Sequence, residues 1–237
     1  MPDPVKSRSY DSPLRRQQAA ATRGVILEAA QRRFEQDGYQ TASVQTIAAE
    51  ASVSPKTVHM AFHTKAGLLR AVWDARLAAD EAAVPVLQRR WFRDLVADPD
   101  PEGKLRRLAR QSREVKSRSG DLTEVIRNAA AVDGQIAELW DDIEAKLLYV
   151  QGAVVGQLEA IGALRQDLAV ESAIDVLWTL NHPSIWHLLV RSRGWMPEQY
   201  EQWTGDAFCT ELLESWQRDS GRPAPGGAPR RRSQQQQ

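Results

Sequence analysis

The chain of 237 residues has little of what secreted, membrane-spanning or disulfide-bonded proteins need. Its one cysteine, Cys209, excludes a disulfide within the chain and favours a reducing compartment. No run of about 18 apolar residues occurs, so a membrane span is not expected. The first residues lack the apolar core of a signal peptide. We therefore expect a cytoplasmic protein without membrane contact.

The sequence also lacks net charge, since 31 basic residues balance 31 acidic ones. The balance is uneven along the chain. Residues 1–80 contain 11 Lys and Arg against 8 Asp and Glu, whereas residues 81–218 contain 16 against 22. A basic head on an acidic body suits a polyanion-binding module joined to a part that does not touch the polyanion, although scatter alone gives such an asymmetry about as often.

Alternating runs of β-branched residues are missing too, and apolar residues recur instead at helical spacing from Leu14 to about Arg218. This pattern predicts an all-α fold. We expect a flexible basic arm at 1–13, a small helical domain at 14–64 that contains the motif described next, a larger helical domain at 65–218 and a disordered tail at 219–237. Within the helical domain, breakers predict helices at roughly 85–97, 101–117, 122–131, 134–163, 170–181, 183–192 and 197–218.

Three short helices near the start have the order of a helix-turn-helix. The first should stop at Gly38, where glycine supports a C-cap. Ser43 is placed to cap the second, and Ser54 to cap the third, with Pro55 at its first position, where a missing N–H costs nothing. The inward positions are Ile47, Ala48, Val53, Val58 and Phe62. Such a core could be purely structural, so the pattern alone does not establish DNA binding.

The order of residues from 22 to 73 strongly resembles the DNA-binding domain of the TetR family of bacterial regulators. The matching residues are Ile26-Leu27-x-Ala29-Ala30, Phe34, Gly38-Tyr39, Thr41, Ser43-Val44, Ile47-Ala48, Ala51, Val53-Ser54, Thr57-Val58, Phe62, Lys65 and Leu68-Leu69. The resemblance implies an N-terminal three-helix DNA-binding domain, followed by a larger helical domain for ligand binding and dimerisation.

Roles at the DNA follow from this resemblance, which places the third helix in the major groove. It implies DNA contacts from Ser43, Gln45, Pro55, Lys56, Thr57, His59, Met60 and Lys65. Gln45 suits adenine, Lys56 suits guanine or a phosphate, and Met60 suits a thymine methyl. The resemblance gives Ser43, His59 and Lys65 to phosphates, which fix register without reading sequence.

Two positions depart from the family pattern. His59 replaces the usual Tyr, which makes pH-sensitive phosphate binding possible. Ser52 replaces the usual Gly of the turn, where left-handed backbone would be strained. They keep open the alternative of a helical small-molecule-binding or scaffold protein whose head no longer binds DNA.

Catalytic and metal-binding patterns are missing from the sequence. There is no Gly-x-Ser-x-Gly, no Gly-rich phosphate loop and no evident His partner for Cys209. His59 and His63 have a spacing that places two ligands on one helix face, but no third ligand follows. We expect no enzyme activity, no cofactor and no metal.

The larger domain is expected to bind a small, largely apolar effector, because aromatic side chains and a few polar ones could line a pocket. The candidates are Trp91, Arg127, Asn128, Trp140, Tyr149, Trp178, Asn181, His182 and Trp186. Filling the core is an equally good use for the tryptophans. The last two helical regions carry more apolar residues than one subunit needs, which predicts a twofold dimer. The sequence thus predicts a ligand-responsive regulator, most simply a repressor, that binds palindromic operator DNA as a homodimer.

Overall fold

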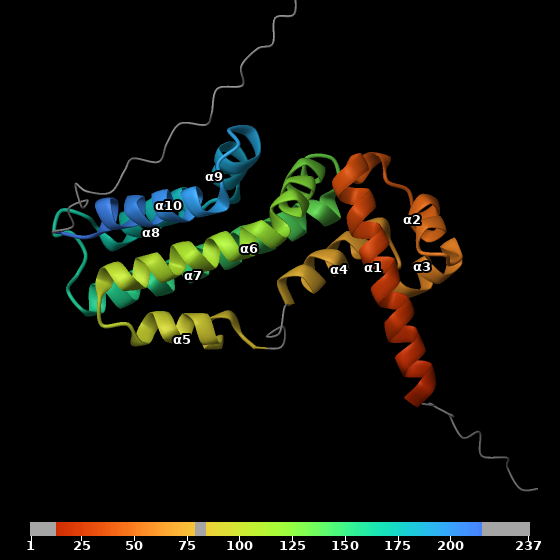
Figure 1. The fold of residues 1–237 in the computed structure, drawn as a ribbon, viewed down its shortest axis with the longest axis horizontal. Helices are drawn as coiled ribbons and strands as arrows, with labels where there is room; N and C mark the ends of the chain where they lie inside the picture. The colour runs from red at the N-terminus through yellow and green to blue at the C-terminus, as the bar shows by residue number, and fades with distance from the viewer. Residues whose placement is uncertain (1–12, 79–83, 215–237) are drawn as a thin grey trace, which may run out of the picture. The chain divides into compact units, whose positions relative to one another are not determined.

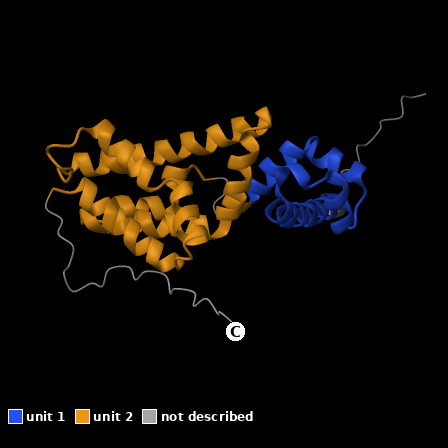
Figure 2. Ribbon diagram, turned by 90° about the horizontal axis from the view of Figure 1, so that it is seen from above, with its two compact units in different colours: residues 1–75 blue, residues 76–237 orange. Residues whose placement is uncertain are grey.

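The computed structural model describes residues 13–78 and 84–214, which are helical without a strand in either range. The chain divides into two compact units, residues 1–75 and 76–237 (Figure 2). The division falls inside the fourth helix, eleven residues later than the expected boundary at 64. The arm before Pro13 and the tail from 219 lie outside the described residues.

Unit 1 is built from α1 (Pro13–Thr41), α2 (Val44–Glu50), α3 (Pro55–Phe62) and the first part of α4 (Lys65–Ala78) (Figure 1). Their apolar faces meet in a core whose fully buried members include Ile26, Phe34, Ile47, Leu68 and Leu69. Val58 and Phe62 of α3 are buried as the spacing predicts. The core leaves the opposite face of α3 exposed.

The helix ends of unit 1 follow the sequence signals. The hydroxyls of Ser43 and Ser54 accept the backbone N–H groups of Thr46 and Thr57, at 3.0 and 3.1 Å. Thr64 caps α4 through the N–H of Gly67 at 2.9 Å. Gly38 has φ 75° and ψ 164°, so it interrupts α1 where the break was predicted, and a short helical turn follows to Thr41.

Unit 2 contains the short helix η2 (Val86–Gln88), then α5 (Arg90–Ala97), α6 (Pro101–Ala130) and α7 (Gly134–Ala160). It continues with α8 (Val170–Leu180), α9 (Pro183–Trp186), the π-helical segment η3 (His187–Ser192) and α10 (Pro197–Leu212). Helices α6 and α7 lie side by side, and α10 packs along both α6 and α8 (Figure 1).

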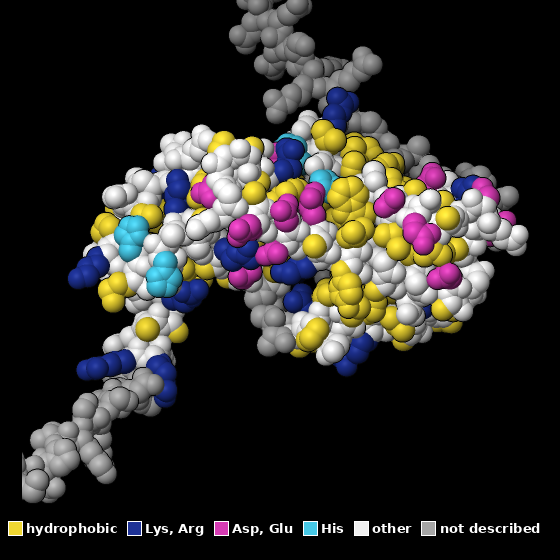
Figure 3. Space-filling view, turned by 180° about the vertical axis from the view of Figure 1, so that it is seen from behind, with side chains coloured by type: hydrophobic (Ala, Val, Ile, Leu, Met, Phe, Trp, Pro, Cys, Tyr) yellow, Lys and Arg dark blue, Asp and Glu magenta, His cyan; other side chains and the backbone are white. Residues whose placement is uncertain are grey.

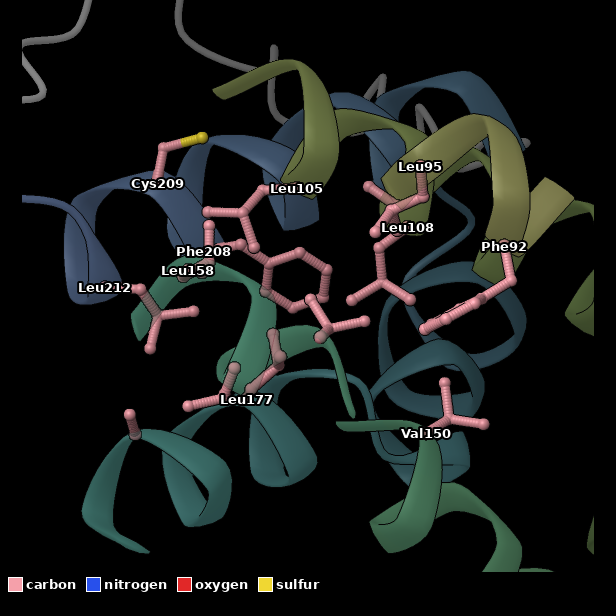
Figure 4. Close-up of a cluster of buried hydrophobic side chains, with 14 residues drawn as sticks. Phe92, Leu95, Leu105, Leu108, Val150, Leu158, Leu177, Phe208, Cys209 and Leu212 are labelled. Carbon is pink, nitrogen blue, oxygen red and sulfur yellow. The ribbon is translucent and has the colours of Figure 1, made fainter. Parts of the chain in front are cut away.

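The core of unit 2 lies between these long helices. Figure 4 shows side chains from α5, α6, α7, α8 and α10 directed toward one another. The cluster comprises Phe92, Leu95, Leu105, Leu108, Ala109, Val150, Val154, Val155, Leu158, Ala173, Leu177, Phe208, Cys209 and Leu212. Cys209 is fully buried, and burial raises the pKa of its thiol to about 12. It is a core residue.

Three sequence predictions for unit 2 are wrong in detail. The helix predicted at 85–97 is divided at Arg89, whose backbone is extended, into η2 and α5. The helices predicted at 101–117 and 122–131 form one helix, because Gly120 does not break α6. An ideal Cβ at Gly120 would lie 2.6 Å from Nε1 of Trp186, so glycine permits close packing there. Helix α10 ends at Leu212 rather than near 218, and Leu213 forms an isolated bridge with Leu164. Across the described ranges, no helix is long and apolar enough to cross a membrane.

Candidate nucleic-acid interface

The exposed face of α3 carries most of the side chains expected to read DNA. Pro55 stands at the first helical position, and Lys56, His59 and Met60 are exposed. Met60 is a large apolar residue, yet 72% of it is exposed. The packing of the helix in unit 1 does not require this exposure. Thr57 is half-buried. Figure 3 shows histidine side chains together with Lys and Arg on the surface of this unit.

The start of α2 supplies two further predicted contacts, with different freedom. Gln45 is exposed and has no part in the cap. Ser43 forms a capping box: its hydroxyl accepts from Thr46 N, and Thr46 Oγ1 accepts from Ser43 N at 3.2 Å. The hydroxyl of Ser43 therefore already has a structural role, and Gln45 is the freer of the two.

The turn between α2 and α3 has the left-handed residue that the family pattern suggested. Ser52 has φ 54°, and Val53 N donates to Ala48 O at 2.9 Å, which closes a Schellman-type end of α2. Serine has a Cβ that disfavours this conformation, so the turn carries some strain. The turn between α2 and α3 nevertheless forms with serine in place of glycine.

A second strained residue, His63, joins α3 to α4. Its φ of 63° and ψ of −58°, with Thr64 N donating to Phe62 O at 2.7 Å, define the rare γ-turn of positive φ. An ideal Cβ at Gly67 would lie only 2.5 Å from the oxygen of Phe62, so this junction is tightly packed. No residue pattern predicted this turn.

The imidazole of His59 faces the same turn. Its Nδ1 lies 3.3 Å from the carbonyl oxygen of His63, where Nδ1–H donates to that oxygen in the matching tautomer. A neutral ring then leaves Nε2 without a proton. While Nδ1–H keeps this bond, donation from Nε2 to a phosphate oxygen needs a second proton on the ring.

Lys65 is placed differently from its predicted role at a phosphate. Its Nζ donates to the carbonyl oxygens of Tyr39, Gln40 and Ala42, at 2.8, 3.3 and 3.2 Å. It also lies 4.4 Å from the centre of the Tyr39 ring. A lysine ammonium has three N–H donors, and the three carbonyls occupy them. Lys65 stabilises the end of α1, and a phosphate contact would require it to give up one of these bonds.

Basic residues of α1 also have partners inside unit 1. Arg23 donates to Ala61 O at 3.2 Å and stacks on the Phe62 ring, which anchors α1 to the end of α3. Arg32 and Arg33 both bind the carboxylate of Glu50, at 2.6 and 2.5 Å. These hydrogen bonds lower the pKa of Glu50, and the bond from Arg32 has the largest effect. Helical spacing could not reveal these pairs, because the partners lie far apart in sequence.

In unit 2, five predicted ligand residues form one neighbourhood: Trp140, Trp178, Asn181, His182 and Trp186. The ring of His182 lies 6.0 Å from that of Trp140 and 4.9 Å from that of Trp178. Its Nδ1 accepts from Ser184 N at 3.2 Å, so Nε2 carries the proton and donates to Glu144 at 3.4 Å. Burial lowers the pKa of His182.

A buried lysine that the sequence reasoning missed adjoins this neighbourhood. Nζ of Lys116 donates to both oxygens of Asn181, at 2.8 and 2.9 Å, and to the Tyr200 hydroxyl at 2.6 Å. Ser112 also donates to Asn181 Oδ1, at 2.5 Å. Desolvation lowers the pKa of Lys116. The Tyr200 ring contacts Trp186, whose buried Nε1 has no hydrogen-bond partner among the described residues.

The other four predicted ligand residues have different surroundings, and of these only Arg127 acts on His182, through its charge. Trp91 stacks edge-on against Phe92 in α5. Arg127 is exposed and bonded to Glu124, Asn128 is exposed, and Tyr149 is 61% exposed. Their aromatic or polar character could not reveal which helix face each residue occupies.

A groove of about 600 Å³ runs between α8 and α10. It is mostly apolar, with Asp and Glu side chains along it, and is lined by Asp175, Val176, Thr179, Leu180, Trp203, Asp206, Ala207, Thr210 and Glu211. Among the apolar residues of the last two helical regions, from which the sequence predicts a dimer, Leu177, Tyr200 and Phe208 fill the core of unit 2. Trp216 lies outside the described residues.

These features define a helix-turn-helix unit joined to a larger helical unit. Residues 26–72 match the family model described as "Bacterial regulatory proteins, tetR family", so this part of unit 1 is similar to the N-terminal domain of that family. Over about four fifths of the chain, the fold is that of solved structures described as TetR regulators.

Solved structures of similar fold include a TetR transcription regulator from Haloarcula marismortui, with 21% identity and a TM-score of 0.61 over 82% of this chain and 100% of that one. A protein of Mesorhizobium loti, described as a TetR-family transcriptional regulator, has 20% identity and a TM-score of 0.63 over 83% and 98%. A protein of Saccharomonospora viridis, described as a transcriptional regulator and solved with choline, has 20% identity and a TM-score of 0.64 over 83% and 100%. No curated protein matches the chain.

Proposed function

We propose that this protein is a ligand-responsive transcriptional regulator, most simply a repressor, that binds palindromic operator DNA as a homodimer through α3. The observation that carries the proposal is the exposed face of α3. Lys56, His59 and Met60 project from a capped helix whose other face is fixed in the core of a TetR-type domain. A helix held in this way can enter the major groove without reorganising.

The proposed contacts divide into base reading and backbone positioning. Gln45 reads adenine through its amide, Lys56 meets guanine acceptors or a phosphate, and Met60 meets a thymine methyl. Pro55 and Thr57 approach the groove beside them. Ser43 and His59 meet phosphates.

For Lys65 we propose a supporting role instead of a phosphate bond. Its ammonium holds three carbonyls at the end of α1, which positions the start of α2 where Gln45 lies. Loss of Lys65 should therefore lower the stability of unit 1 and leave the salt dependence of DNA binding unchanged.

Dimerisation is assigned to the groove between α8 and α10. The apolar residues that line this groove include Val176, Leu180 and Trp203. They face an open groove in a single chain, and a second copy would bury them. Two helices from each copy would form a four-helix contact about a twofold axis. The two α3 helices would then lie about 34–36 Å apart, one turn of DNA, and require a palindromic site.

The effector is assigned to the neighbourhood of His182, Trp178, Trp140, Asn181 and Trp186. Aromatic rings with a few polar groups suit a small, largely apolar molecule. The choline complex of the similar Saccharomonospora viridis protein supports small-molecule binding in this fold. Binding would favour a spacing of the two DNA-binding units that no longer fits adjacent grooves, and DNA would favour the other spacing.

Selection of bound sequences from a random duplex pool tests the function directly. The expected result is an enriched palindrome whose half-sites are centred about one DNA turn apart. Absence of any enriched sequence would contradict DNA recognition, and an enriched single half-site would contradict the dimer.

Alanine variants then locate the interface on the selected duplex. Lys56→Ala should weaken binding at least ~10-fold and, if it meets a phosphate, reduce the salt slope by about 1. Lys65→Ala should lower the thermal stability and leave the slope unchanged. Lys146→Ala, an exposed lysine of α7, is the control and should change neither.

A further inference from the structure

Lys116 places a buried cation in unit 2 without a carboxylate beside it. Its ammonium donates to two oxygens of Asn181 and to the Tyr200 hydroxyl, and all three acceptors are neutral. Burial lowers the pKa of Lys116 and only Tyr200 opposes this, so no carboxylate of the described ranges acts on the ammonium. Glu201 and Asp206 of α10 are bound instead by arginines of α6. The interior of unit 2 therefore holds a positive charge that its own residues leave uncompensated.

The two partners of Lys116 have donors left over. Because the ammonium donates to the hydroxyl oxygen of Tyr200, the proton of that hydroxyl remains free to donate elsewhere. Oδ1 of Asn181 accepts from both Ser112 and Lys116, so Nδ2 is the opposite end of the same amide. Among the described residues, neither the Tyr200 hydroxyl nor Asn181 Nδ2 has an acceptor. Both donors thus lie beside a cation and can receive an anion.

Two further buried polar groups come from α7 and α10. The side chain of Gln151 is fully buried, and its oxygen and nitrogen both lack a hydrogen-bond partner in the described part of the chain. It lies two turns after Glu144, on the same face of α7. Thr204 lies one turn after Tyr200 and is also buried, with an unpartnered hydroxyl. Since buried polar groups are rarely left unpaired, unit 2 has more hydrogen-bonding capacity than its own residues use.

An aromatic region adjoins the donors and reaches the surface. His182 directly follows Asn181, and its ring lies close to those of Trp140 and Trp178. These three side chains are half-buried, whereas Lys116 and Asn181 are buried. The site therefore has a deep end with donors and charge, and an outer end that is aromatic. Such an arrangement suits an apolar molecule with one acidic group.

We propose that the effector site of unit 2 takes an apolar carboxylic acid, bound as its carboxylate. The inference rests on the effector of the proposed function and names its chemical class. The carboxylate accepts from the Tyr200 hydroxyl and from Asn181 Nδ2, while the ammonium of Lys116 keeps its three bonds and offsets the charge. The apolar part lies against Trp140 and Trp178. Hydrogen bonds to a charged group are the stronger ones, so the acid group sets the affinity.

Isothermal titration of the full chain at pH 7 with three probes of one chain length tests the class of ligand. The probes are octanoate, 1-octanol and octyltrimethylammonium. The dissociation constant of octanoate should be at least ~10-fold lower than that of either other probe, the scale of hydrogen bonds to a charged group. Lys116→Met should remove this preference. Lys146→Met, at an exposed lysine of α7, is the matched control and should keep it.

Asn181→Asp separates ligand binding from a role in folding. The new carboxylate retains an oxygen where Lys116 and Ser112 already donate, and supplies the missing counterion within the chain. The variant should therefore have a higher thermal midpoint, yet bind octanoate at least ~10-fold more weakly than the wild type. Its affinity for 1-octanol should be unchanged. A merely structural role of these residues would not weaken octanoate binding in a more stable protein.

The outcomes distinguish the ligand class from the function on which it rests. Equal affinities for the three probes, tighter binding of octyltrimethylammonium, or no binding of millimolar octanoate overturns the acid. An octanoate preference that survives in Lys116→Met also overturns it. Any of these results, with operator binding intact, leaves the regulator standing. Octanoate that binds through Lys116 but leaves operator affinity unchanged supports the acid site and contradicts ligand-responsive regulation through it.

Discussion

Gly120 lies in the middle of α6, where its missing side chain leaves room for the ring of Trp186. An ideal Cβ at this position would approach Nε1 and Cδ1 of that ring to 2.6 and 3.0 Å. Gly120→Ala gains about 1 kcal/mol from helix propensity. It must also displace a buried indole that packs on Tyr200 at 4.9 Å, and such overpacking costs about 1–3 kcal/mol.

Gly156 provides a matched control, because it lies in α7 and a Cβ there would meet nothing within 4 Å. Gly156→Ala should raise the free energy of unfolding by about 0.5–1 kcal/mol. The free energy of unfolding of Gly120→Ala should lie about 1–3 kcal/mol below that of Gly156→Ala, because of the cost of overpacking. Urea unfolding followed by far-ultraviolet circular dichroism measures the difference. Equal stabilisation by the two alanines would refute the packing of Trp186 against α6.

Three further predictions concern titration and backbone strain. Burial lowers the pKa of Lys116, so between that value and the ordinary value of 10.5 the unfolded chain binds more protons, and stability rises with pH in this window. Lys116→Met should remove that rise in urea unfolding followed up to pH 10.5, and an unchanged pH profile would contradict a lowered pKa for the buried lysine. His63→Gly should raise the free energy of unfolding by about 1 kcal/mol by relieving the positive φ, and an unchanged or lower value would argue against strain at the γ-turn. Operator affinity of the wild type should be higher at pH 6 than at pH 8, whereas His59→Tyr should lose this difference; equal pH responses would exclude a phosphate bond from protonated His59.

The fold of unit 1 could be predicted because its signals are local. Ser43, Ser54 and Thr64 cap the helices that follow them, Gly38 interrupts α1, and Pro55 begins α3. Each of these effects depends on a few neighbouring residues, which the sequence shows directly. The exposed face of α3 followed from the same spacing.

The candidate DNA site was predicted less completely, because a residue type does not determine its partners. Lys65 has the charge for a phosphate, yet three carbonyls lie within reach of its ammonium. Those carbonyls belong to residues 23 to 26 positions earlier, at the end of another helix. Whether a lysine faces solvent or a helix end depends on how the helices cross, and no local pattern specifies that angle.

In unit 2, the roles of Gly120 and Lys116 of α6 also depend on partners that local sequence does not reveal. Gly120 resembles a helix breaker, but its role is to admit Trp186 from a segment 66 residues later. Lys116, one turn earlier, lies on the buried stripe with Leu105, Leu108 and Ser112, where an apolar residue is expected. Its ammonium is accommodated because Asn181 and Tyr200 supply oxygen atoms from two other segments. A buried ammonium held only by neutral oxygens costs more than an apolar side chain in the same place. We infer that this buried lysine is better explained by a requirement for one arrangement of α6, α10 and the end of α8 than by stability.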